Sequence, residues 1–459
     1  GEGLNVGCVL TWGPCYDYQR KFFSSKIDRL SEPRTLLKYD LEISGFGSQS
    51  LGHVCLLNLT DQEYPGSDGT STKGWPTWTV PVMKWAKDQG GVTGYAHSAS
   101  GLAINPANEA KRLIASRDRN GDSRLTEAEA ATGVLPLPFA TIDTERDASL
   151  TEPELRAALE SAADQLPNHA IPEMNGVGAM EICVSTAEGV CDFISAMDTE
   201  RIQEWNTWYH VLNCGFPLKV SGETDFPCMS SLQVGQGRVY VQLGQPDRID
   251  FGDWCRGLAS GRSYVSDGYA HAVKFAVNGV APGDGNVSLD AAGTVDIVAE
   301  VAFAPETPRN VAYGTLTATA GPRVAGDTRV LHVPRSREWA AGGERRVELV
   351  VNGRVAATQT VPADGAVHPL SFRIPVERSS WIALRQFPQL HTNPVEVHIA
   401  KQPVRASRNS ALWCTEMTEV LWKNRESRIS KDEREAASVV YRRAIERYRA
   451  IAAECADGT

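Results

Sequence analysis

The sequence lacks any run of about 18 consecutive apolar residues, so we expect no membrane-spanning helix. Its ten cysteines include no Cys-x-x-Cys pair, which argues against a clustered zinc finger or ribbon. Their even number is compatible with disulfides in an oxidising compartment and equally with buried free thiols. The first residues carry neither an initiator methionine nor a basic segment followed by an apolar one. We therefore expect no signal peptide and a start inside a domain.

Two signatures of common enzyme classes are also absent. No Gly-x-Ser-x-Gly segment occurs, which disfavours a Ser/His/Asp hydrolase. Gly235-Gln-Gly237 is not a dinucleotide loop, because Tyr240 stands where the third glycine is needed. Basic residues are outnumbered: 46 Lys and Arg against 56 Asp and Glu give a net charge of −10. This net negative charge would repel a nucleic acid or an anionic membrane, so neither partner is expected.

What is present is a globular composition, with 42% hydrophobic residues in a chain of 459, enough for two or three domains. Residues 1–273 alternate short apolar runs with amphipathic stretches, which favours a parallel sheet or barrel. Residues 274–404 change to alternating runs between Gly, Pro and Asp, which is typical of an antiparallel sandwich. Residues 405–459 show helical spacing and predict two closing helices. Strands are expected at 9–10, 54–57, 91–95, 178–183, 218–220, 294–302, 345–356 and 395–400, and helices at 80–89 and 199–212.

Two calcium-loop motifs interrupt the first of these regions, at 108–165, and we interpret them as an insertion. Each motif places oxygen ligands at loop positions 1, 3, 5 and 9, a backbone carbonyl at 7 and a glutamate at 12. Calcium is coordinated by several hard oxygen ligands. The candidate calcium ligands are Asp118, Asn120, Asp122, Arg124 (through its carbonyl) and Glu129 in the first loop, and Asp143, Glu145, Asp147, Ser149 and Glu154 in the second.

Two features qualify this calcium hypothesis. Position 6 prefers glycine for its sharp turn, but the chain has Ser123 and Ala148 there, which is expected to weaken affinity. The alternative is a pair of helix N-termini, because Thr126 with Glu129 and Thr151 with Glu154 also fit the capping box. That alternative leaves the aspartates of both loops unexplained. With only six methionines in the chain, a structural calcium staple is favoured over a sensor.

Histidines and carboxylates stand at the ends of predicted strands, where α/β folds gather their ligands. Glu42 lies in an apolar strand, His53 opens the next, and His97 follows a third. Glu223 and Asp225 follow a fourth. Two imidazoles with carboxylates suit one or two divalent metals, which lower the pKa of a bound water. A strand-end histidine that merely hydrogen-bonds a carbonyl is the alternative for each residue singly.

The same segments resemble the CehA/McbA-type metallohydrolases of the PHP (polymerase and histidinol phosphatase) superfamily. The resemblance is carried by Glu42-Ile-Ser, Gly52-His53, Ala96-His97, Gly222-Glu-Thr-Asp225, Gly261-Arg-Ser-Tyr-Val-Ser-Asp-Gly268, Val277-Asn-Gly279 and Ser380-Trp-Ile-Ala-Leu-Arg385. It implies an α/β fold with a distorted β/α (PHP-like) barrel, N-terminally incomplete, followed by an Ig-like β-sandwich. It also implies that Glu42, His53, His97 and Asp225 hold zinc, manganese or iron.

The chain departs from this family at three places. The opening His-x-His motif is absent, Thr11-Trp12-Gly13 replaces a Thr-Asp-His run, and Pro227 stands where the last histidine would be. A mono- or dinuclear site is therefore expected rather than a trinuclear one. Glu223 is a candidate general acid/base. His210 is a candidate catalytic or substrate-contacting group, with a packed helix histidine as the alternative.

These observations favour a metal-dependent hydrolase acting on an ester, carbamate or phosphoester bond of a small-molecule or carbohydrate-derived substrate. The alternative is a non-catalytic, calcium-stabilised protein that binds a carbohydrate or surface ligand on a vestigial barrel. Calcium loops of modest quality fill only where calcium is plentiful, which favours an extracytoplasmic (periplasmic or secreted) location. The sequence indicates no oligomeric state.

Overall fold

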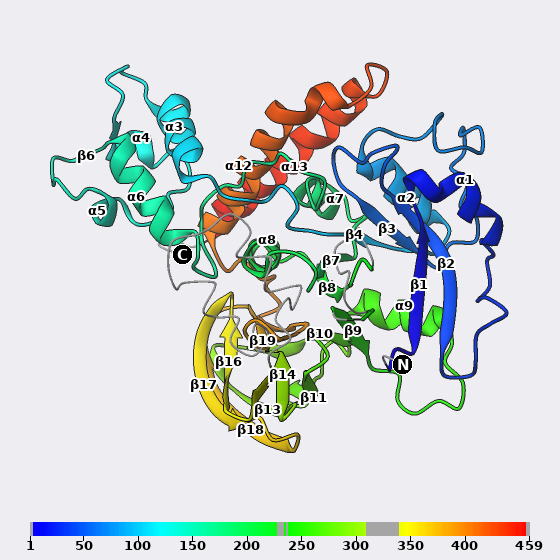
Figure 1. Cartoon of the computed structure of the whole chain (residues 1–459). Helices are drawn as coiled ribbons and strands as arrows, with labels where there is room; N and C mark the ends of the chain where they lie inside the picture. Colours follow the sequence, from blue (N-terminus) through cyan, green and yellow to red (C-terminus); the bar gives the residue numbers. More distant parts are fainter. Residues whose placement is uncertain (1–2, 227–233, 236, 309–338, 456–459) are drawn as a thin grey trace.

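The computed structural model describes residues 3–226, 234–235, 237–308 and 339–455 (Figure 1). The chain forms a mixed α/β structure with a curled, half-barrel sheet, a second group of strands and two C-terminal helices. In Figure 1 the first sheet lies to the right, the second group of strands at the bottom, and a small helical unit at the upper left. The calcium-loop motifs belong to that small unit, and Pro227 lies outside the described residues.

The first sheet has six strands, in the spatial order β1-β2-β3-β4-β7-β8. β1 pairs parallel with β2, and β4, β7 and β8 are mutually parallel, but β3 is antiparallel to both of its neighbours. The parallel arrangement expected from the sequence is therefore wrong at β3, because a loop over 44–53 joins β2 to β3 in place of a crossover helix. The bounds are β1 (Val6–Thr11), β2 (Leu36–Ile43), β3 (Val54–Leu57), β4 (Val92–Tyr95), β7 (Phe193–Ala196) and β8 (Lys219–Gly222).

Most expected elements of this region are confirmed, including the strands near 9–10, 54–57, 91–95 and 218–220. The strand expected at 178–183 is wrong, because a helix begins at Ile182, and a short segment buried at every position does not distinguish a strand from a helix. The helices here are η1 (Gly13–Cys15), α1 (Tyr16–Gln19), η2 (Arg20–Phe22), α2 (Thr79–Asp88), α7 (Ile182–Ala187), α8 (Arg201–Asn213) and α9 (Phe251–Ser260). Every residue of α8 is buried, and its Trp205, Trp208 and Tyr209 are fully enclosed.

The insertion between β4 and β7 folds around a small hydrophobic core of its own, which includes Leu113, Leu125, Leu150 and Leu159. Two helix-loop-helix units face each other through a short antiparallel pair, in which Leu125 lies opposite Leu150. The elements are α3 (Pro106–Arg117), β5 (Leu125–Thr126), α4 (Glu127–Ala130), α5 (Phe139–Ile142), β6 (Ser149–Leu150) and α6 (Glu152–Ala162). The unit stands out from the rest of the chain in Figure 1 and docks on α12 (Arg408–Arg425).

The second group of strands forms two sheets that share one hydrophobic core, and a separate antiparallel pair of β14 and β15. The larger sheet has the order β12-β21-β19-β20-β10-β9, with β16 and β17 joined at β19, and the smaller is β11-β13-β18. Alternate residues of β13 and β18 are buried, as a sheet with one face toward water requires. The strands are β9 (Arg238–Val241), β10 (Ser263–Ser266), β11 (Ala270–Val277), β12 (Val287–Leu289), β13 (Gly293–Phe303), β14 (Glu306–Pro308), β15 (Trp339–Ala341), β16 (Glu344–Val351), β17 (Arg354–Pro362), β18 (Val367–Val376), β19 (Ser380–Gln386), β20 (Leu390–Thr392) and β21 (Val395–Ile399).

Three details of these sheets differ from the sequence expectations. The run at 345–356 is a hairpin of two strands, turned at Asn352 and Gly353, whose φ values of 50° and 84° suit a two-residue turn. β12 and β21 pair in parallel, against the antiparallel expectation. β9 and β10 also belong to the larger sheet, and the expected boundary at residue 274 falls inside β11.

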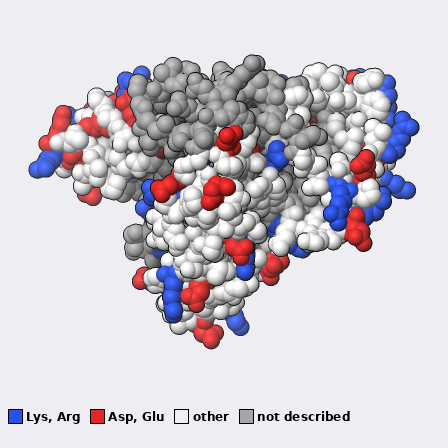
Figure 2. Space-filling view, turned by 60° about the horizontal axis from the view of Figure 1, so that its bottom comes forward, with Lys and Arg blue, Asp and Glu red and all other residues white. Residues whose placement is uncertain are grey.

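The two expected C-terminal helices are confirmed as α12 (Arg408–Arg425) and α13 (Arg434–Glu454), joined through η4 (Glu426–Arg428). They pack on each other and cross the top of the molecule in Figure 1. On the face shown in Figure 2, acidic and basic side chains are interspersed over the two-sheet part. Among the described residues, no helix is both long and apolar enough to cross a bilayer.

A buried carboxylate at the start of α7 ties α13 to α2. Glu181 accepts hydrogen bonds from the backbone N–H and the hydroxyl of Thr79, both at 2.6 Å, and from the Tyr441 hydroxyl. Burial raises the pKa of Glu181 to about 7. The carboxyl therefore stays protonated in the fold at pH values where the unfolded chain has released the proton.

This raised pKa predicts that stability falls as pH rises. The contribution of Glu181 is fully present below pH 4.5, its ordinary pKa, and is lost as pH rises through about 7. We expect urea unfolding to show up to about 3 kcal/mol less stability at pH 8 than at pH 5 from this group. Glu181→Gln should remove that part of the slope, and Glu435→Gln, an exposed change on α13, should not. Equal slopes for wild type and Glu181→Gln would contradict the prediction.

Candidate metal centre

One edge of the first sheet collects histidines and carboxylates from five neighbouring strands. Glu42 lies near the end of β2, His97 follows β4, and Asp198 follows β7. His53 immediately precedes β3, and β3 is antiparallel to its neighbours, so its start lies at the edge where they end. Glu223 and Asp225 follow β8 at the same edge. The local sequence therefore places a ligand-type residue at the terminus of five of the six strands at this edge.

The first ligand group consists of Glu42, His53 and His97, with one ligand atom from each within 4.8 Å of the others. Glu42 Oε1 lies 3.2 Å from His97 Nε2 and 3.6 Å from His53 Nδ1. The two imidazole rings meet edge to face, with centroids 5.3 Å apart. The sequence analysis selected all three residues, and the structure brings them together.

The second ligand group uses the opposite nitrogen of the same histidine. His97 Nδ1 lies 3.2 Å from Asp225 Oδ2 and 3.4 Å from Asp198 Oδ2, and these three residues form a group of the same compactness. Glu223 Oε1 accepts the backbone N–H of His97 at 2.5 Å and lies 3.9 Å from His97 Nδ1. His97 is thus the common member of both groups, with one ring nitrogen facing each.

Asp198 is the site residue that the sequence analysis missed. Its side chain is fully buried, and it follows the four-residue apolar run Phe193–Ala196, which forms β7. A signal was available, because an aspartate two residues beyond a buried strand repeats the pattern of His97 after β4. The strand is only four residues long and was not predicted, so Asp198 was not identified as a residue at the end of a strand.

The backbone at this edge adopts unusual conformations. His97, Met197 and Asp225 have φ values of 40°, 84° and 46°, in the left-handed region that residues other than glycine seldom occupy. Such conformations cost of order 1–3 kcal/mol each and are found at functional sites, where the surrounding fold enforces them. Here they turn the chain sharply at two of the ligand positions.

Burial and mutual proximity shift the protonation of these groups. Burial, helped by His97, lowers the pKa of His53 to about 4, so its ring is neutral. Burial opposes charge on His97, but hydrogen bonds with Asp198 and Glu42 raise its pKa well above the ordinary value. Burial raises the pKa values of Glu223, Asp225 and Asp198. These three carboxylates therefore lie close together with little positive charge nearby to balance them.

His210, the other candidate catalytic residue, is not brought to this edge. Its Nε2 lies 2.7 Å from the Asn168 carbonyl, and its Nδ1 lies 3.0 Å from the Ser410 hydroxyl. The ring stacks on Trp413 with centroids 4.2 Å apart, and the side chain is fully buried. This is the geometry of the packed helix histidine that the sequence analysis held as the alternative.

The two calcium-loop motifs form matching loops. Asp118 accepts the backbone N–H of Gly121 and Ser123, and Asp143 accepts those of Asp147 and Ala148. Position 6 has a φ of 63° at Ser123 and 62° at Ala148, the conformation for which glycine is preferred.

Both capping boxes are also present, with Thr126 paired to Glu129 and Thr151 paired to Glu154. Among the described residues, only the two groups that share His97 bring three His, Cys, Asp or Glu ligand atoms within 4.8 Å. The Arg124 side chain pairs with Asp147 of the other loop and lies 2.8 Å from the Ser149 hydroxyl. The loops are therefore built in register, and calcium binding stays a prediction.

The nine cysteines of the described residues are free thiols, and Cys228 lies outside them. Comparison with models of protein families, with curated proteins and with solved structures found no match. The resemblance to the CehA/McbA-type metallohydrolases therefore rests on the residues of this chain alone.

Proposed function

We propose that the chain is a metal-dependent hydrolase whose centre lies at the edge formed by Glu42, His53, His97, Asp198 and Asp225. The observation that carries this proposal is the convergence of a second imidazole and three carboxylates, from separate strands, on the buried His97. In our proposal the sheet is a PHP-like barrel and the two-sheet part is Ig-like, as the resemblance implies.

The residues present fit a divalent transition metal. Two ligands held about 2.1 Å from one ion lie at most about 4.2 Å apart, and the 3.2 and 3.6 Å separations around Glu42 satisfy that limit. His53 Nδ1 and Asp198 Oδ1 are buried without a hydrogen-bond partner, which is costly unless a ligand engages them. Imidazole with carboxylate is a donor set suited to zinc, manganese or iron.

Each residue has a separate task in this proposal. Glu42, His53 and His97 Nε2 would hold the ion. Asp198 would orient the His97 ring through Nδ1, in the carboxylate-histidine arrangement common at metal sites. Asp225 extends the site and, with Asp198, would hold a second ion. A bound divalent ion supplies a Lewis acid and a water of lowered pKa. The side chain of Glu223 is 19% exposed, so it can reach a substrate and is the proposed proton donor or acceptor.

The class of bond that the protein would hydrolyse follows from the same metal chemistry. Metal-assisted hydrolysis suits an ester, carbamate or phosphoester, in a small-molecule or carbohydrate-derived substrate. To test this, the metal would be removed with a chelator and restored, and p-nitrophenyl acetate, a p-nitrophenyl carbamate and bis(p-nitrophenyl) phosphate would be assayed. We expect hydrolysis of at least one substrate that disappears with the metal and returns with it. Metal-loaded protein that hydrolyses none of the three would favour the binding-protein alternative.

We also propose that the loops starting at Asp118 and Asp143 bind calcium as a structural staple, and that the protein works in a calcium-rich extracytoplasmic setting. Wild type should bind two calcium ions, and calcium should raise the temperature of thermal unfolding of the insertion. Asp118→Ala should lower the stoichiometry to one, because the loop loses its position-1 ligand. Calorimetric titration with calcium, using Glu160→Gln on exposed α6 as the control, measures this. No calcium uptake by wild type would leave the loops as capping boxes only.

A further inference from the structure

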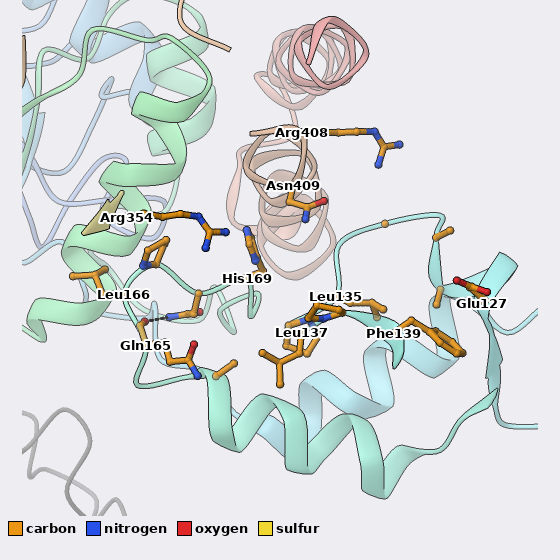
Figure 3. Close-up of a pocket in the computed structure, with 18 of the residues that line it drawn as sticks. Glu127, Leu135, Leu137, Phe139, Gln165, Leu166, His169, Arg354, Arg408 and Asn409 are labelled. Atoms are coloured by element: carbon orange, nitrogen blue, oxygen red, sulfur yellow. Dashed lines mark hydrogen bonds between the residues drawn. The ribbon is translucent and has the colours of Figure 1, made fainter. Parts of the chain in front are cut away.

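A cavity of about 770 Å³ lies away from the metal centre, where three parts of the chain meet (Figure 3). Its walls come from the insertion, from the β16–β17 hairpin at Arg354, and from the start of α12 at Arg408 and Asn409. None of the proposed metal ligands lines it. A volume of this size, at a junction between structural units, is typical of sites for small organic ligands.

One wall of the cavity is cationic. Arg354 and Arg408 both line it, and neither forms an ion pair with a carboxylate among the described residues. Figure 3 shows the His169 ring between the Arg354 guanidinium and the Asn409 amide, with the Arg408 side chain directed away from Arg354. Burial, helped by Arg354, lowers the pKa of His169 to about 4, so the ring is a neutral hydrogen-bonding group. The positive charge beside His169 therefore comes from the Arg354 guanidinium, and Arg408 adds a second cation elsewhere in the lining.

The facing wall is apolar, and the sequence explains why. Residues 135–139 read Leu-Pro-Leu-Pro-Phe, and all five line the cavity. Proline lacks a backbone N–H and disfavours a helical conformation in the residue before it. Leu135 and Leu137 each precede a proline, so they do not form part of a helix. Leu135, Leu137 and Phe139 are only partly buried against the core of the insertion. Their remaining apolar surface faces the cavity opposite Arg354 (Figure 3).

We propose that this cavity binds an amphipathic organic anion, with its carboxylate or phosphate head against Arg354 and its apolar body against Leu135, Leu137 and Phe139. Unpaired guanidinium groups recognise carboxylate or phosphate oxygens through two parallel hydrogen bonds. Glu127, the one acidic residue of the lining, lies at the far rim beyond Phe139, which places negative charge away from the head. A cation or an uncharged chain of the same length lacks the head-group contact.

The probes are decanoate and decyl phosphate, titrated into the full chain by isothermal calorimetry below their micellar concentrations. Decanol and decyltrimethylammonium test the apolar body without the anion. We expect saturable binding of at least one anion, about tenfold or more tighter than either control. The two anionic arms decide between a carboxylate and a phosphate head.

Two variants link the binding to the cavity. Arg354→Gln should weaken binding of the anion about tenfold, because it removes a charge-assisted contact from an exposed turn without disturbing the core. Arg373→Gln, on the exposed face of β18, should leave the dissociation constant unchanged. Binding of neither anion, equal binding of decanol, or equal effects of the two substitutions would overturn the proposal. None of these outcomes depends on the metal centre being active.

Discussion

Replacing His97 with alanine is expected to empty the metal centre. His97 belongs to both ligand groups, with Nε2 toward Glu42 and Nδ1 toward Asp198 and Asp225. Loss of a residue that merely orients a metal ligand lowers metal affinity about 10- to 100-fold, so loss of the shared ligand should cost more than about 100-fold. Bound metal, measured after dialysis against a weak chelator, should fall below detection, and any metal-dependent hydrolysis should fall with it.

Two companion variants show whether this effect is local. Asp198→Asn should retain metal at high concentration but lower its affinity about 10- to 100-fold, because Asp198 orients the His97 ring. His210→Ala removes another buried histidine, bonded to Asn168 and Ser410, and should lower stability while the metal remains. Loss of metal in His210→Ala to the extent seen in His97→Ala would mean that His97 acts through general folding.

The second large effect is expected at Glu416, where the insertion docks on α12. Glu416 accepts hydrogen bonds from Arg117 Nη2 at 2.7 and 2.9 Å, from Arg112 at 3.1 Å and from the Val134 N–H at 2.8 Å. Glu416→Gln leaves the Arg117 charge buried without its carboxylate, which costs about 3–5 kcal/mol. Urea unfolding followed by circular dichroism should show a loss of that size.

A control for this pair lies three residues further along the same helix. Glu419 pairs with Arg449 at 2.6 Å, and both side chains are exposed. Glu419→Gln should therefore cost no more than about 1 kcal/mol, because exposed ion pairs contribute little. Similar losses for the two substitutions would show that Glu416 does not hold the insertion in place.

Sequence periodicity and turn chemistry were sufficient for many elements of the fold. The alternation in Gly293–Phe303 gave a strand with one buried face, and the spacing of apolar residues near the end gave two helices. Buried segments were harder to predict. Residues 178–183 look like a strand because they form a short, mostly apolar run, but they lead into α7. The strand pairing of β3 was also inaccessible, because direction depends on the length of a connection and not on the composition of the strand.

The candidate site was accessible from the sequence to the extent that its residues mark strand ends. Glu42, His53, His97 and Asp225 were selected on that basis, and the structure gathers them at one edge. Asp198 was missed because the short strand before it was missed. His210 was included because its position on a helix does not reveal that both ring nitrogens already have hydrogen-bond partners. The cavity at Arg354 is formed by three segments that are far apart in the sequence, and no pattern within one segment predicts such a junction.

The metal content of the purified protein shows whether the edge around His97 holds a transition metal. Inductively coupled plasma mass spectrometry on protein purified without chelator or a nickel column would count every bound ion. We expect one or two zinc, manganese or iron ions per chain, lost in His97→Ala and retained in Asp118→Ala, with calcium lowered only in Asp118→Ala. Calcium as the sole bound metal in wild type would contradict this expectation.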